Sequence, residues 1–259
     1  MPLSKQQKDD IKNLLLFQIR KKLKTYKPET TSMPFHTRLL GKDRMALFSF
    51  IHSFNTTLGT SIFEQVAKII GQSHFPRIVS QYSIGNQISS SAQNTIQEIM
   101  NKLTTSELLP DKEKETNKVL KVAQEGEIIF VKPRRVDLCI QNNYGVEYYF
   151  DLKTAKPNIG DFEKYKRMLL EWIGIRGRQA KNISIHTCLA IPYNPYEPKP
   201  YKRWTLQGLF DVENEILVAD EFWDFLGGSG TYQDTLDVFE EAGLELKSEI
   251  EDRFSDFRS

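Results

Sequence analysis

The sequence of 259 residues has few cysteines and histidines and no long hydrophobic run. No segment approaches the roughly 20 apolar residues of a membrane span, and the N-terminal run MPLSKQQKDDIKNLLLF is not of signal-peptide type. We therefore expect a cytoplasmic protein with no membrane partner. The two cysteines, Cys139 and Cys188, lie in strand-like runs, where a buried thiol is expected rather than a disulfide or a metal ligand.

The scarce residues also exclude two kinds of site. The four histidines show no His-x-x-x-His spacing, which argues against a zinc protease: His36, His52, His74 and His186. The glycine-rich stretch at 227–230 is followed by neither Gly-Lys-Ser/Thr nor a dinucleotide fingerprint, so a nucleotide site is not expected.

Charge is present in both signs but is unevenly distributed. Residues 205–259 hold 15 acidic and 3 basic side chains, a balance of −12, which leaves residues 1–204 with 32 basic and 19 acidic, a balance of +13. This asymmetry predicts a polyanionic partner for the basic part and a solvated acidic C-terminal part. The alternative is that the helix faces are simply solvated and happen to differ in sign.

Apolar residues at helical spacing predict helices in the N-terminal half, over residues 4–25, 43–58, 61–71, about 90–107 and 109–126. The first is basic and amphipathic. The helix at 61–71 begins with the capping box Ser61-x-x-Glu64 and ends at Gly71.

At residue 127 the spacing of apolar residues changes from helical to strand-like. Two strands at 127–140 and 146–154 are joined by the turn cluster 141–145, a helix covers 159–177, and a buried strand covers 182–193. A proline-rich loop at 192–204 and then a strand with two or three acidic helices follow. We expect an α/β fold of one domain over 1–259, with a mainly helical part (1–126), an α/β core (127–204) and an acidic helical part (205–259).

Charged side chains interrupt the aromatic strand YYFDLKT. Because side chains alternate along a strand, Asp151 and Lys153 share one face, about 6–7 Å apart. The predicted hairpin returns Asp137 to within about one residue of a position opposite Asp151. Two facing carboxylates either repel, which raises one pKa, or bind a cation, and Mg²⁺ is the ion that prefers such oxygen ligands.

The triplet Asp137, then Asp151-Leu152-Lys153 after a gap of 13 residues, resembles the core of the PD-(D/E)xK nucleases, although Val136 stands where the family name has proline. The resemblance implies a restriction-endonuclease-like mixed sheet flanked by helices. It also implies Mg²⁺ held by Asp137, Asp151 and the backbone carbonyl of Leu152. Glu64 matches the further acid that such nucleases carry on a preceding helix; the alternative is that Glu64 only completes the capping box.

A narrower resemblance covers most of the chain from about residue 43 onward. FEQVAKIIG, RRVDLCI, YYFDLKTAKPN, AIPYNPYEPKPYKRW and EFWDFLGG are similar to the TdeIII/MjaII-type group of type II restriction endonucleases. The group implies cleavage of duplex DNA at GGNCC in a bacterium or archaeon, and pairing with a DNA methyltransferase. A structure-specific repair nuclease and, less favoured, a non-catalytic DNA-binding module are the alternatives.

Cleavage of a palindrome calls for two active sites, so a homodimer is expected, and the N-terminal helix either supports that dimer or packs on its own core. Lys153 has two candidate roles, on the attacking water or on a phosphate oxygen. The candidate DNA contacts are basic residues expected on the metal side: Lys132, Arg134, Arg135, Lys156, Arg176, Arg178, Lys181, Lys199, Lys202 and Arg203.

Overall fold

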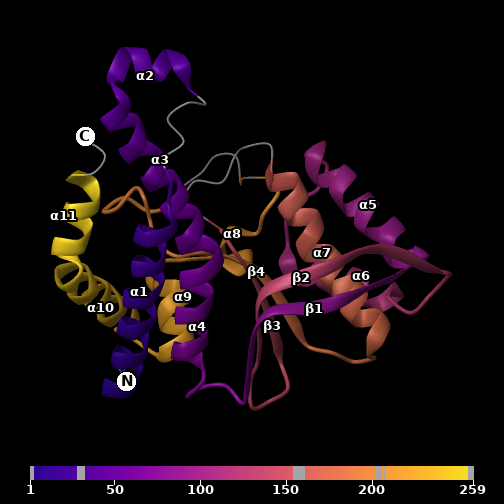
Figure 1. Cartoon of the computed structure of the whole chain (residues 1–259). Coiled ribbons are helices and arrows are strands. Elements are labelled where there is room, and N and C mark those ends of the chain that lie inside the picture. The colour runs from indigo at the N-terminus through magenta and orange to yellow at the C-terminus, as the bar shows by residue number, and fades with distance from the viewer. Residues whose placement is uncertain (1–2, 28–32, 154–160, 202–205, 207, 256–259) are drawn as a thin grey trace.

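A five-stranded sheet runs through the middle of the computed structural model, which describes residues 3–27, 33–153, 161–201, 206 and 208–255 (Figure 1). Its strands, in spatial order, are β1 (Arg77–Ser89), β2 (Ile128–Gln141), β3 (Glu147–Leu152), β4 (Ile185–Ile191) and β5 (Ile216–Val218). Strand β2 runs antiparallel to both β1 and β3, whereas β3, β4 and β5 run parallel to one another. The predicted mixed α/β sheet is confirmed.

Helices cover both faces of this sheet. One face is covered by α5 (Ser90–Thr104), α6 (Lys112–Val122) and α7 (Phe162–Gln179), and the other by α1 (Lys5–Thr25), α4 (Phe63–Gly71), α9 (Asp220–Gly227) and α10 (Thr231–Glu245). The remaining helices are α2 (Pro34–Leu40), α3 (Lys42–Thr57), the π-helix η1 (Leu58–Ile62), α8 (Val212–Glu215) and α11 (Lys247–Ser255). The result is a three-layer arrangement in which the sheet supplies one side of each core.

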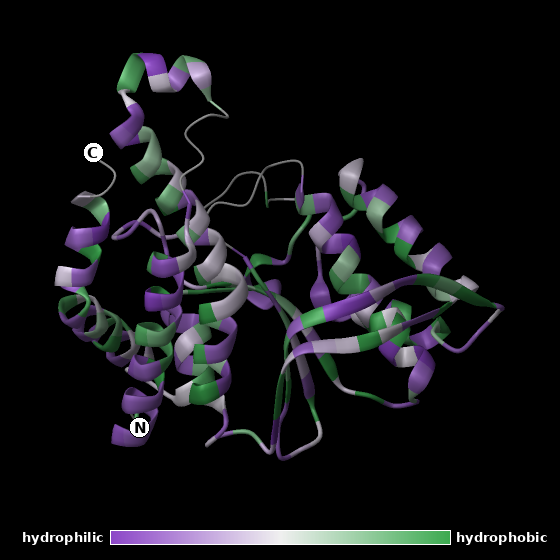
Figure 2. Cartoon of the chain, in the orientation of Figure 1, coloured by the Kyte–Doolittle hydropathy of each residue, from purple (hydrophilic) through white to green (hydrophobic). Residues whose placement is uncertain are grey.

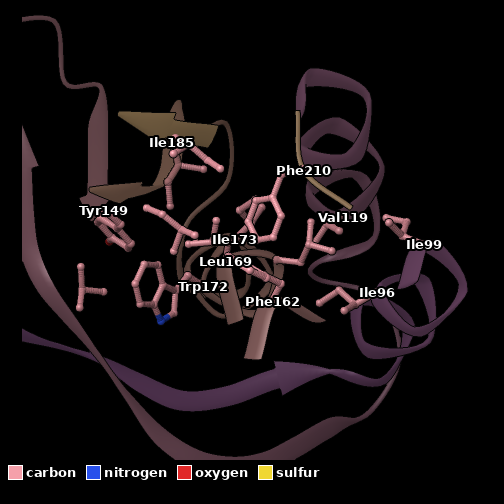
Figure 3. Packing of buried hydrophobic residues seen from close by; sticks show 14 of the residues in the cluster. Ile96, Ile99, Val119, Tyr149, Phe162, Leu169, Trp172, Ile173, Ile185 and Phe210 are labelled. Carbon is pink, nitrogen blue, oxygen red and sulfur yellow. The ribbon is translucent and has the colours of Figure 1, made fainter. Parts of the chain in front are cut away.

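Side-chain alternation along β3 divides the two cores. Tyr149 points to the α5–α7 side, where it packs with Trp172 and Leu169 (Figure 3), whereas Phe150 and Leu152 point to the α1 and α9 side. Figure 2 shows hydrophobic residues along the central strands, as expected for strands buried on both faces. The rigid core therefore fixes the end of β3, where Asp151 and Lys153 lie.

The basic N-terminal helix and the acidic C-terminal helices pack together. Lys8 pairs with Asp234 at 2.7 Å, and Arg20 pairs with Glu249 at 2.9 Å, so α1 bridges to α10 and α11. The expectation that the acidic part is merely solvated is therefore wrong, because part of its charge offsets the basic charge of α1. Each such exposed pair contributes little stability on its own.

A buried ion cluster joins α6, α7 and α8. Lys166, whose side chain is fully buried, lies 2.5 Å from carboxylate oxygens of both Glu115 and Glu215. Lys112 adds a second ammonium 2.9 Å from Glu215 and donates to Thr187 of β4 at 2.7 Å. Because each charge is paired, the cluster fixes α7 against the sheet without leaving an isolated buried charge.

Most predicted elements are confirmed within a few residues. The helices expected over 4–25, 43–58, 90–107, 109–126 and 159–177 are α1, α3, α5, α6 and α7, and the strands expected after residue 127 are β2, β3 and β4. The described part of residues 205–259 contains α8, β5, α9, α10 and α11. The prediction that strands begin at residue 127 is wrong, because β1 (Arg77–Ser89) precedes it. Helix α2 was also not predicted. Among the helices described, none combines the length and the apolar character needed to cross a membrane.

Candidate active site

The hairpin of β2 and β3 brings two acids together. The last regular pair of the ladder is Leu138 with Phe150, and one step further along the same register Asp137 lies opposite Asp151. The connecting loop, residues 142–146, is closed by hydrogen bonds from backbone N–H groups to the side chain of its first residue. The predicted hairpin and the facing of the two acids follow from this register.

Asp151 and Lys153 form an ion pair on one face of β3, as alternation predicts. The Nζ atom of Lys153 lies 2.5 Å from Oδ2 of Asp151 and 4.9 Å from the ring centroid of Tyr165 on α7. Burial, reinforced by the charge of Asp137 and opposed by Lys153, raises the pKa of Asp151 to about 6. Burial acts to lower the pKa of Lys153, but the paired carboxylate of Asp151 prevails and the pKa is raised.

Glu64 is the third acid of the site and lies on helix α4. Only 3% of the residue is exposed, and this burial is the main reason that its pKa rises to about 7. A hydrogen bond from Gln81 lowers the pKa, whereas the charges of Asp137 and Asp151 raise it further. Three acids from two strands and a helix therefore share one electrostatic environment.

The capping-box alternative for Glu64 is wrong. Helix α3 continues through η1 into α4, so no helix N-terminus exists at Ser61. Residue Ile62 flanks the start of α4, no side-chain cap is formed there, and the Ser61 hydroxyl lies 3.4 Å from that of Thr60. The Glu64 carboxylate is bonded instead to Gln81, across the sheet edge.

Gln81 is a site residue that the sequence prediction missed. Its Nε2 donates to both carboxylate oxygens of Glu64 at 2.9 Å and to Oδ1 of Asp137 at 3.3 Å. It lies on β1, the strand that was not predicted, and within a polar stretch that gives no pattern of alternation. The signal that could have found it is the requirement for a strand beside β2, which would bring this segment to Asp137.

The carboxylate oxygens of the site suit a hard divalent cation, although those of Glu64 and Asp137 accept hydrogen bonds in this structure. Oδ2 of Asp137 accepts from the Leu152 backbone N–H at 2.8 Å, and Oδ2 of Asp151 is buried with the Lys153 ion pair as its contact rather than a well-formed hydrogen bond. Among the described residues, no three His, Cys, Asp or Glu side chains converge as a ready-made metal site. Carboxylate and carbonyl oxygens are nevertheless the ligands that Mg²⁺ prefers, so the chemistry fits and Gln81 separates two of the donors.

Part of the predicted DNA-contact set lies away from these acids. Arg176 forms a two-pronged hydrogen bond with Glu147, at 2.8 and 2.7 Å, at the first residue of β3. Asp151 lies four residues further along the strand, about 13 Å away at the usual rise per residue. Arg178 and Lys181 follow Arg176 toward this end of β3, so a DNA contact by these three residues stays a prediction.

The other basic candidates differ in their surroundings. Arg134 is paired with Glu171 of α7, whereas Lys132 and Arg135 are exposed on β2. Lys199 is exposed in the loop that follows β4, at the same end of the sheet as Asp151. Three further candidates lie outside the described residues: Lys156, Lys202 and Arg203.

Comparison with known families agrees with this geometry. The family model described as "Type II restriction endonuclease, HinfI" matches residues 3–243. The chain belongs to the HinfI family of type II restriction endonucleases. The matched segment contains all four candidate catalytic residues of this HinfI-family chain, from Glu64 to Lys153.

Individual relatives carry the same description. The chain is 28% identical to the type II restriction enzyme HgiCII of Herpetosiphon aurantiacus, over 84% of this chain and 80% of that protein. It is also 28% identical to the type II restriction enzyme MjaII of Methanocaldococcus jannaschii, over 92% of this chain and 70% of that protein. The resemblance to a group that includes MjaII is thus confirmed, and the matching HinfI-family model confirms the prediction of a restriction endonuclease.

Proposed function

We propose that this restriction endonuclease uses Mg²⁺ to hydrolyse phosphodiester bonds in double-stranded DNA at a short palindromic site, with GGNCC as the expected target. The observation that carries the proposal is that Glu64, Asp137, Asp151 and Lys153 lie near one end of β3 and influence one another's charge. Membership of the HinfI family supports cleavage of DNA. The GGNCC target rests on the resemblance to the TdeIII/MjaII-type group.

The proposed metal ligands are Asp137, Asp151 and the backbone carbonyl of Leu152, with Glu64 acting directly or through water. Bound Mg²⁺ would lower the pKa of a coordinated water and offset the charge of the scissile phosphate. The elevated pKa values of Glu64 and Asp151 support this assignment, because buried acids that repel one another gain from a nearby cation.

Lys153 is proposed to hold a phosphate oxygen as negative charge develops on it. The ion pair with Asp151 raises the pKa of Lys153, so the side chain carries a positive charge in this arrangement. A protonated ammonium stabilises an anionic transition state but accepts no proton from water. The packing of Lys153 over Tyr165 restricts the direction in which it can reach.

The experiment is cleavage of plasmid DNA containing GGNCC sites, in Mg²⁺ and in EDTA, with sequencing of the fragment ends. Discrete fragments that require Mg²⁺ and end at one short sequence are expected. Random nicking, or cutting that depends on a branched substrate, would favour a structure-specific nuclease instead. Unchanged cutting by Asp151→Ala would refute the assignment of the site, and DNA binding without any cutting would favour a binding module.

A homodimer that acts in the cytoplasm beside a protecting DNA methyltransferase remains part of the proposal. Helix α1 buries Ile11, Leu15 and Leu16 in its own core, so it is not the favoured dimer surface. Helix α2 projects from the body of the molecule and buries no residue of its own (Figures 1 and 2). Exposed apolar side chains on α2 and α3, here called the exposed face of these helices, support self-association: Phe35, Leu39, Leu40, Leu47, Phe48 and Ile51.

A further inference from the structure

Gln81 has a backbone conformation that side-chain-bearing residues rarely adopt. Its φ is +53°, although it lies within β1 and its neighbours on both sides pair regularly with β2. The same register places Gln81 across from Asp137. A positive φ outside glycine costs free energy and persists where the surroundings impose it, which is common at functional sites.

The side chain of Gln81 lies between two acids that come from different elements. Its amide nitrogen donates to Oε1 and Oε2 of Glu64 on α4, each at 2.9 Å, and to Oδ1 of Asp137 on β2 at 3.3 Å. The amide NH₂ group is a neutral donor, and carboxylates accept but do not donate when ionised. The nitrogen therefore holds together two groups that would otherwise repel one another.

We propose that Gln81 is a positioning residue that holds Glu64 and Asp137 in place in the metal-free enzyme and releases them when a divalent cation binds. The inference rests on the proposed function, since it takes these acids as metal ligands. A cation held between the acids would compete for the oxygen lone pairs that now accept hydrogen bonds from the Gln81 amide, so cation binding would displace this amide. Gln81 thus stabilises the metal-free site and weakens its apparent affinity for the cation.

The sign of the effect follows from linkage. An interaction present only in the metal-free state must be broken on binding, so removing it tightens binding while it destabilises the metal-free protein. Gln81→Met keeps the length of the side chain and removes the donor. It is expected to bind Mg²⁺ about tenfold more tightly, the factor that corresponds to one charge-assisted hydrogen bond.

The test uses two measurements without DNA: calorimetric titration of the full chain with MgCl₂ or CaCl₂, and the melting temperature with and without each salt. Gln81→Met should melt lower than the wild type without cation and show a larger rise when cation is added. Gln81→Glu, which puts a fourth carboxylate at the site in place of the donor, should show both changes more strongly. Gln87→Met is the matched control, because Gln87 is an exposed glutamine further along β1.

The outcomes separate the two proposals. If the wild type binds cation, Asp151→Ala does not, and Gln81→Met binds with unchanged or weaker affinity, then the role of Gln81 is refuted while the metal site stands. If the wild type binds no cation, or Asp151→Ala binds equally well, the proposed metal site itself is wrong. If Gln81→Met does not fold, Gln81→Glu decides, and an affinity no tighter than that of the wild type refutes the inference.

Discussion

The carboxylate of Asp137 accepts a hydrogen bond from the backbone N–H of Leu152 at 2.8 Å. The bond lies just beyond Leu138 and Phe150, the last regular backbone pair of β2 and β3. The Asp137 side chain therefore continues the hydrogen bonding between the two strands where the backbone pairing ends. The same bond holds Asp137 next to Asp151, which ties the geometry of the candidate site to the pairing of the strands.

This bond predicts different effects for two substitutions of Asp137. Asp137→Asn keeps an oxygen that can accept from Leu152, so the free energy of unfolding should change little, while Mg²⁺-dependent cleavage should fall by at least about a hundredfold because a charged ligand is lost. Asp137→Ala should also be destabilised, by about 1–3 kcal/mol, because a backbone N–H loses its partner. Urea unfolding and plasmid cleavage measure the two effects, and equal stability of both variants would contradict the structural role of the bond.

Stability of the metal-free protein should depend on pH in a defined direction. Glu64 and Asp151 have raised pKa values, so the folded protein binds these protons more tightly than the unfolded chain does. The free energy of unfolding is then highest at low pH with respect to these groups, and the contribution of Glu64 is lost as pH rises from about 4.5 to 7. The loss should be roughly 1–3 kcal/mol, and thermal melting of EDTA-treated protein measures it.

Two comparisons assign this pH dependence to the site. Glu64→Gln removes one of the titrating acids and should flatten the decline of melting temperature between about pH 4.5 and 7. Mg²⁺ should oppose the decline in the wild type, because the cation favours the ionised acids. A decline that persists unchanged in Glu64→Gln would place its origin elsewhere in the molecule.

Arg176 should contribute to stability rather than to DNA binding. Its bonds to Glu147 join α7 to the start of β3, and the Glu147 side chain is only 7% exposed. Arg176→Ala leaves that carboxylate without its ion-pair partner, with the Tyr149 hydroxyl still donating to it, and should cost about 2–4 kcal/mol. Arg135 is exposed on β2, so Arg135→Ala should leave the free energy of unfolding unchanged but weaken DNA binding. The slope of the logarithm of the DNA-binding constant against the logarithm of salt concentration should become shallower by about one. The reverse pattern in unfolding and binding titrations would contradict the assignment.

The exposed face on α2 and α3 should control self-association. Leu39 is 83% exposed on that face, and Leu39→Glu should convert a dimer to a monomer in sedimentation or light-scattering measurements. Leu109→Glu is the matched control, because Leu109 is 81% exposed outside this face. A dimer that survives Leu39→Glu would mean that a different surface forms the contact.

The sequence was most informative where hydrophobic periodicity and strand alternation act together. Alternation alone places Asp151 beside Lys153, and a short loop fixes the register that brings Asp137 opposite. These are local consequences of backbone geometry, so a single sequence is enough to predict them. The ion pair and the hairpin are confirmed for that reason.

The parts that were missed depend on contacts made by the folded chain. Strand β1 has the sequence RIVSQYSIGNQIS, which is polar and interrupted by Gly85, and its position at the sheet edge requires no hydrophobic alternation. Because β1 was not predicted, the sequence offered no reason to place Gln81 beside Asp137. The positive φ of Gln81 is likewise a feature of the folded chain that the local sequence does not signal.

A local motif also misled the prediction at Ser61-x-x-Glu64. The same four residues are compatible with a helix start and with a helix that continues through one wide turn, and contacts elsewhere select the second. The distance of Arg176 from the acids has a comparable origin. The helix that crosses between two parallel strands carries its last turn back to the beginning of those strands.

The packing of α1 against α10 has a consequence for how the enzyme is made. The core behind Phe150 and Leu152 is closed by side chains from α9 and α10, including Phe222, Trp223 and Val238, which follow every candidate catalytic residue in the sequence. A nascent chain that already carries every candidate catalytic residue therefore still lacks the two helices that complete the core on this face of the sheet. We therefore expect a chain that ends before α9 to lack a stable nuclease site, because the helices that close this core are missing.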